Sequence, residues 1–126
     1  MPCVLIVEDD DDSREMLELL LASNEYETMS ARNGQEALAQ MRQRRPCLVL
    51  LDLQMPVMTG WEFRERQLED PELADVPVVC VTAFFNPGEV EQQLGLRCLP
   101  KAGQFTAVMN EVQSLCGKGR TQPILD

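Results

Sequence analysis

Short apolar runs recur along the chain, and segments with helical spacing separate them. Three of the runs, residues 4–7, 48–51 and 78–81, are continuously apolar and rich in β-branched side chains. Such runs are typical of strands buried on both faces of a parallel sheet. Residues 26–31 alternate polar and apolar side chains, as a half-exposed edge strand does, and residues 97–99 form a short fifth run. The pattern predicts five strands.

The segments between these runs contain recognisable helix starts. In each, a side chain that can cap a helix precedes a glutamate by three residues, the arrangement of a capping box. The pairs are Asp12 with Glu15, Asn33 with Glu36, Thr59 with Glu62, and Asn86 with Glu89, the last with Pro87 at the first helical position. Apolar residues then repeat at helical spacing. They are Leu17, Leu20 and Leu21 in the first helix, Ala37, Leu38 and Met41 in the second, and Phe105, Val108, Met109, Val112 and Cys116 in the last.

Strands that alternate with helices predict a (βα)5 doubly wound three-layer α/β sandwich around a parallel five-stranded sheet. We expect one domain over residues 1–116, because 126 residues suffice for a single core. The polar residues 117–126 are expected to form a flexible tail.

Composition excludes several classes of function. The net charge of −10 argues against direct nucleic-acid binding, because phosphate backbones require Lys/Arg patches. The absence of histidine removes His-based catalysis and His-ligated zinc, and no apolar run is long enough to cross a membrane. The five cysteines form no C-x-x-C pair and lie mostly in or beside apolar runs. We therefore expect reduced, buried thiols and a cytoplasmic protein.

Chemistry is expected at the carboxyl ends of the strands, where open α/β sheets bind ligands. Glu8 and Asp9 follow the first run, Asp52 the third, Thr82 ends the fourth, and Lys101 follows the fifth. Three carboxylates in one crevice repel one another unless a hard divalent cation compensates their charge. A site with a small number of carboxylates plus water molecules suits Mg²⁺ better than Ca²⁺, which prefers more oxygen ligands. We expect Asp52 to attack phosphorus and form an aspartyl phosphate, whose charge Lys101 and Thr82 help to neutralise.

Four segments in this order resemble the receiver domain of bacterial two-component response regulators. They are residues 4–10 (VLIVEDD), 51–60 (LDLQMPVMTG), 81–83 (VTA) and 99–101 (LPK), and the second is highly specific. The resemblance spans residue 3 to about residue 116 and implies a flavodoxin-like fold with strand order 2-1-3-4-5. By position it implies Asp52 as phosphoacceptor, Asp9 as a direct Mg²⁺ ligand, Glu8 as a ligand mainly through water, the backbone carbonyl of Gln54 as a further ligand, Thr82 as the switch hydroxyl and Lys101 as the phosphate-pairing cation.

The resemblance also implies partners. The phosphoryl donor would be a phosphohistidine on a sensor histidine kinase or a histidine phosphotransfer protein. The chain would then be a phosphorelay module rather than an enzyme, and it would control a downstream protein that the sequence does not identify. Helix 4, strand 5 and helix 5 form the family's usual output face, which also allows a dimer.

Three departures from the family bear on the output. Ala102 follows Lys101 where the family has a cis proline, and a cis bond to alanine costs about 2.5–4 kcal/mol. We expect either a trans bond with Lys101 slightly moved or a strained cis bond. Cys98 aligns with the aromatic residue of strand 5 that takes part in the family's switch. The segment from residue 82 to residue 101 is shorter than is usual in the family, which predicts a shorter fourth helix or shorter loops around it. Phe84 either covers the phosphorylation site or anchors its loop.

Other readings remain open. A pseudo-receiver would bind partners without phosphorylation, and the chain would equally suit a receiver excised from a larger regulator or hybrid kinase. An aspartyl-phosphate hydrolase would need a second acid two residues after the nucleophile, where this chain has Gln54. A flavodoxin-like electron carrier would need hydroxyls and amides for the flavin phosphate, where residues 8–12 are all acidic.

Overall fold

A computed structural model of the chain describes residues 3–52, 60–82, 92, 97–100 and 105–117. Strands and helices alternate as far as residue 82, and one more strand and one more helix follow among the described residues. The strands are β1 (Cys3–Val7), β2 (Glu27–Ala31), β3 (Leu48–Leu51), β4 (Val78–Thr82) and β5 (Arg97–Pro100). The helices are α1 (Asp11–Ser23), α2 (Gly34–Gln43), α3 (Gly60–Glu69) and α5 (Phe105–Cys116). Of the predicted fourth helix only residue 92 is described, and it is helical. No described helix is long and apolar enough to cross a membrane.

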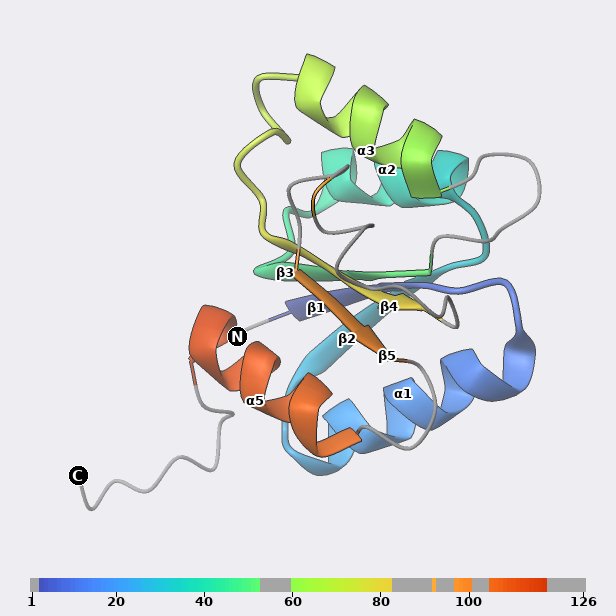
Figure 1. The fold of residues 1–126 in the computed structure, drawn as a ribbon, viewed down its shortest axis with the longest axis vertical. Coiled ribbons are helices and arrows are strands. Elements are labelled where there is room, and N and C mark those ends of the chain that lie inside the picture. The colour runs from blue at the N-terminus through green and yellow to red at the C-terminus, as the bar shows by residue number, and fades with distance from the viewer. Residues whose placement is uncertain (1–2, 53–59, 83–91, 93–96, 101–104, 118–126) are drawn as a thin grey trace.

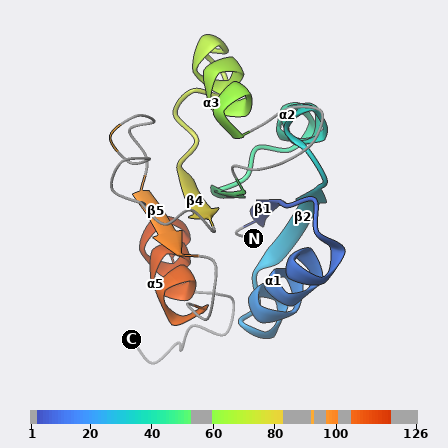
Figure 2. The same ribbon diagram turned by 45° about the vertical axis from the view of Figure 1, so that its right-hand side comes forward.

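The five strands form one parallel sheet in the order β2-β1-β3-β4-β5, as predicted. Helices α2 and α3 cover one face, while α1 and α5 cover the other (Figures 1 and 2). Every residue of β1 and β3 is buried, because both strands lie inside the sheet and helices cover both of its faces. The continuous apolar runs therefore predicted the central strands correctly.

Successive side chains of the central strands enter different cores. Leu5 and Val7 pack with Phe63 of α3 on one face of the sheet. Val4 and Ile6 pack with the helices of the other face. The expected inward residues of α2 are all buried, and in α1 Leu17 and Leu21 are buried while Leu20 is half-buried. In α5, Val108 and Val112 are buried, and Met109 and Cys116 pack against the same core.

Two of the four predicted helix starts lie within the described residues. Asn33 caps α2 as expected, since its side chain accepts a hydrogen bond of 2.9 Å from the Glu36 N–H. The prediction for α1 is wrong: Asp10, not Asp12, is the N-cap, and it accepts from the Ser13 N–H at 2.9 Å. Asp12 already lies inside the first turn, where its charge favours the helix N-terminus. The starts at Thr59 and Asn86 lie outside the described residues.

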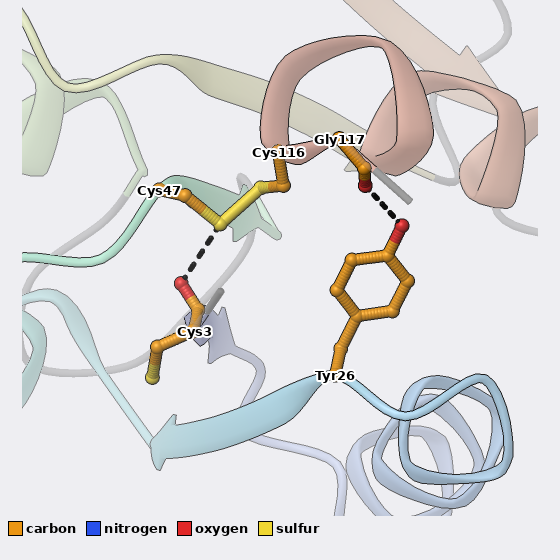
Figure 3. Close-up of a disulfide and its surroundings, with 5 residues drawn as sticks. All are labelled: Cys3, Tyr26, Cys47, Cys116 and Gly117. Atoms are coloured by element: carbon orange, nitrogen blue, oxygen red, sulfur yellow. Dashed lines mark hydrogen bonds between the residues drawn. A yellow bond between two sulfur atoms is a disulfide. The ribbon is translucent and has the colours of Figure 1, made fainter. Parts of the chain in front are cut away.

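The fold also corrects the prediction that the cysteines are reduced. Cys47 and Cys116 form a disulfide with their Cα atoms 5.4 Å apart, across a sequence separation of 69 residues (Figure 3). Helix α5 runs antiparallel to β3, so the end of α5 lies beside the start of β3. The local sequence around neither cysteine reveals this proximity. Cys3 and Cys80 are buried thiols, as expected.

Candidate functional site

The first strand and the third carry the acidic residues of the site. β1 and β3 are neighbouring parallel strands, and Val7 pairs with Leu51 at their carboxyl ends. Glu8 and Asp52 follow these two residues directly, so the register places them side by side. Carboxylate oxygens of Glu8, Asp9 and Asp52 all lie within 4.8 Å of one another. The structure thus brings together the three acids that the strand-end rule indicated.

The backbone holds two of these acids firmly. The Asp52 N–H donates to the Val7 carbonyl at 2.9 Å, and the Glu8 N–H donates to the Ala31 carbonyl at 3.0 Å. Asp52 is only 6% exposed and Glu8 only 3%, whereas Asp9 is exposed. Glu8, Asp9 and Asp52, hereafter the acidic group, therefore consist of two buried residues with fixed backbones and one residue that is open to solvent.

This donor set fits a hard divalent cation. Burying carboxylates so close together is unfavourable without compensating positive charge. The site offers oxygen ligands only, from few side chains, and it is open to water beside exposed Asp9. A small hard cation that keeps part of its water shell prefers such a site. The acidic group can therefore hold a metal ion.

The remaining expected site residues are described only in part. Thr82 ends β4 and pairs with Pro100 of β5, and Lys101 follows Pro100 in the chain. The Thr82 side chain, Gln54 and Lys101 lie outside the described residues. The same holds for the expectations about Ala102, the Cys98 side chain and Phe84.

Sequence reasoning missed Arg14, which lies beside the acidic group. Its Nη1 donates to the Glu8 carbonyl at 3.1 Å, and its Nη2 forms an ion pair with Asp11. The hydrogen bond to Asp11 raises the pKa of Arg14. Arg14 thereby ties the first turn of α1 to the end of β1. Its spacing of three residues from Asp11 was the available signal, since such pairs face each other on a helix.

Comparison with known proteins agrees with this geometry. The family model for the response regulator receiver domain matches residues 4–105. The polar-differentiation response regulator DivK of Brucella anthropi is 40% identical over 89 residues, which are 71% of this chain and 72% of that protein.

Solved receiver structures are also similar. The signal receiver domain of a signal transduction histidine kinase from Syntrophus aciditrophicus has a TM-score of 0.84 at 30% identity, covering 98% of this chain and 97% of that one. Response regulator protein TrrA from Thermotoga maritima, solved in complex with Mg²⁺-BeF, has a TM-score of 0.80 at 27% identity, covering 91% of this chain and 99% of that one.

The family match decides against the hydrolase and flavodoxin-like electron-carrier readings, which share only chemistry or fold with this chain. Strand order, the acidic group at the carboxyl edge and the matched family model over residues 4–105 agree. The chain therefore belongs to the response-regulator receiver domains and acts in phosphorylation-based phosphorelay signalling.

Proposed function

We propose that Asp52 is the phosphoacceptor of this receiver domain and that the acidic group binds one Mg²⁺. The observation that supports the proposal most strongly is the separation of the three carboxylates, all within 4.8 Å of one another. Glu8, Asp9, Asp52 and the backbone carbonyl of Gln54 would hold the ion. When bound, the ion supplies positive charge that offsets the negative charge of the transferring phosphoryl group.

Asp52 is the best nucleophile of the three acids. It directly follows buried β3, and its N–H donates to the Val7 carbonyl, so its backbone is fixed at the carboxyl end of the strand. Glu8 is held in the same way, and its family position, as a ligand mainly through water, leaves Asp52 as the nucleophile. In the proposed transfer, one Asp52 oxygen forms a bond to phosphorus while the bond from phosphorus to the donor's histidine nitrogen breaks. Exposed Asp9 lacks such a rigid setting. By family position, the Thr82 hydroxyl and the Lys101 ammonium bind the phosphoryl oxygens of the product.

The proposed partners follow from family membership. Receiver domains are signalling modules that work with histidine kinases and phosphotransfer proteins. We propose that this chain takes its phosphoryl group from one of these, does not itself turn over a substrate, and switches binding to a downstream protein in the cytoplasm. The receiver domain would comprise residues 1–116, followed by a tail, and the face formed by helix 4, β5 and α5 would allow dimerisation.

Two alternatives within the family make different predictions. A pseudo-receiver would bind partners without phosphorylation, and the departures at Cys98 and Ala102 favour testing it. A receiver domain from a larger regulator or hybrid kinase is supported by the similar Syntrophus aciditrophicus domain, which belongs to a histidine kinase. The second alternative leaves the chemistry at Asp52 unchanged.

Phosphorylation by a small-molecule donor tests the proposal. The protein is incubated with acetyl phosphate and Mg²⁺, and intact mass measures the phosphoryl groups per chain. We expect one group on the wild type, none on Asp52→Asn, and none in excess chelator. Asp12→Asn is the matched control, because it removes the same charge from an exposed residue outside the acidic group and should leave incorporation unchanged. Wild-type protein that binds Mg²⁺ but neither incorporates phosphate nor binds beryllofluoride would identify a pseudo-receiver.

A further inference from the structure

The Cys47–Cys116 disulfide lies near the amino ends of the strands, and the acidic group lies at their carboxyl ends. Cys47 directly precedes β3, whose other end leads into Asp52, and Cys116 is the last residue of α5. The bond therefore joins the strand that leads to the acidic site with a helix on one face of the sheet (Figure 3). Such a bond is unexpected in a cytoplasmic protein, where disulfides are mostly transient and redox-sensing.

Of the four cysteines whose side chains the structure describes, the two that form the disulfide are the more exposed. Cys47 and Cys116 are half-buried, whereas Cys3 is only 3% exposed and Cys80 is fully buried. Figure 3 shows the Cys3 sulfur directed away from the disulfide. Burial raises the pKa of the Cys3 thiol, so this neighbour holds little of the thiolate that exchange requires. Among the described cysteines, the pair is therefore more open to exchange with an external dithiol than with Cys3 or Cys80.

The structure also accommodates the reduced state of Cys47. Its sulfur lies 3.2 Å from the Cys3 carbonyl oxygen. A disulfide sulfur carries no hydrogen, so this approach is a plain contact while the bond is intact. After reduction, the Cys47 thiol can donate a hydrogen bond to that carbonyl, which limits the cost of breaking the disulfide.

The disulfide is the main inward anchor for the last turn of α5. Gln113, Ser114 and Leu115 are exposed, and the buried residues Val108 and Val112 lie one turn or more before the end. Beyond the helix, the Tyr26 hydroxyl donates to the Gly117 carbonyl. Gly117 has φ of 76°, a left-handed conformation that suits glycine and ends the helix. Once the disulfide is reduced, the described contacts that hold the last turn against the rest of the protein are this hydrogen bond and the packing of Cys116.

We propose that Cys47 and Cys116 are a reversible redox pair whose disulfide fixes the last turn of α5 to the start of β3, and whose reduction releases that turn. A dithiol reductant would attack one sulfur to form a mixed disulfide, and its second thiol would then displace the protein. Two electrons and two protons pass to the protein, giving two thiols, and the reductant leaves as a disulfide. The reverse exchange with a small-molecule disulfide restores the bond.

The full chain is equilibrated with defined ratios of oxidised and reduced dithiothreitol. Its free thiols are then alkylated in denaturant, and the intact mass of the protein gives the number of labelled cysteines. Oxidised protein should have two of its five cysteines protected from the tag, and peptide mapping should find Cys47 linked to Cys116. Hydrogen exchange then compares the two states. Reduction should speed exchange at residues 113–117 on the order of tenfold or more through local opening, whereas β3 should still exchange only through global unfolding.

Three variants make this test specific. Cys116→Ser should behave as the reduced wild type at every ratio. Cys3→Ala keeps the backbone carbonyl at the same edge and should retain the full redox response. Asp52→Asn should respond like the wild type, so a failure of phosphorylation leaves this test intact. Should Cys116→Ser fail to fold, the redox titration of the wild type with dithiothreitol still tests whether Cys47 and Cys116 form a reversible pair. Pairing with another cysteine, no disulfide under oxidising conditions, or equal exchange of the last turn in both states would overturn the proposal.

Discussion

Replacing Asp52 with asparagine removes one charge from the acidic group while keeping the size of the side chain. In the metal-free protein, three carboxylates lie within 4.8 Å of one another, and two of them are nearly buried. At that separation, two unit charges in an effective dielectric of about 20 repel by about 3.5 kcal/mol. Water screens exposed Asp9, and neighbouring polar groups offset part of the rest. We therefore expect Asp52→Asn to raise the free energy of unfolding by ~1–2 kcal/mol in chelator.

Mg²⁺ should reverse this order. An ion that binds only the folded state adds about 2.7 kcal/mol of stability at a concentration one hundred times its dissociation constant. The wild type should gain this stabilisation, whereas the variant has lost one of its three carboxylate ligands and should gain much less. Urea unfolding followed by Trp61 fluorescence measures both conditions, since Trp61 is the single tryptophan.

Asp12→Asn separates this effect from a general change in net charge. Asp12 lies in the first turn of α1, where its loss removes a favourable interaction with the helix N-terminus of about 0.3–1 kcal/mol. The control should therefore be slightly less stable than the wild type and should keep the full response to Mg²⁺. Asp52→Asn that is no more stable than this control in chelator, or Mg²⁺ that stabilises all three proteins equally, would contradict this expectation.

Three further predictions concern groups that hold the fold. Gln67→Met should lower the free energy of unfolding by about 2–4 kcal/mol in urea, because buried Gln67 donates to the carbonyls of Leu73 and Val76, which would lose that donor; a loss below ~1 kcal/mol would contradict this. Tyr26→Phe should cost about 0.5–1.5 kcal/mol through the lost hydrogen bond to the Gly117 carbonyl, and an unchanged stability would show that bond to be inert. Reduction of the disulfide across its 69-residue separation should lower the unfolding free energy by about 4 kcal/mol, and equal denaturation midpoints with and without dithiol would refute this.

The pattern of apolar residues predicted the sheet because its central strands are buried on both faces. Residues 4–7 and 48–51 are apolar throughout for that reason, and both form central strands. The acidic group was also predictable, because the carboxyl ends of neighbouring parallel strands meet at one edge. Glu8 and Asp52 come together through the pairing of β1 with β3 alone.

Features that depend on long-range geometry were not predictable from local patterns. Cys47 and Cys116 become neighbours only through the full fold, so the disulfide was missed. Gln67 is a polar residue to which the apolar pattern assigned no role, yet it is buried and donates to the carbonyls of Leu73 and Val76. The cap of α1 was misplaced because residues 8–12 are all acidic, and each offers a similar carboxylate.

The position of the phosphoryl group tests the central claim most directly. Wild-type protein is treated with acetyl phosphate and Mg²⁺, and the acyl phosphate is reduced with borohydride, which converts a phosphorylated aspartate to homoserine. Peptide mapping by mass spectrometry then locates the altered residue. We predict homoserine at position 52 and unaltered acids at positions 8 and 9. Modification at another acid, with position 52 unchanged, would contradict the account.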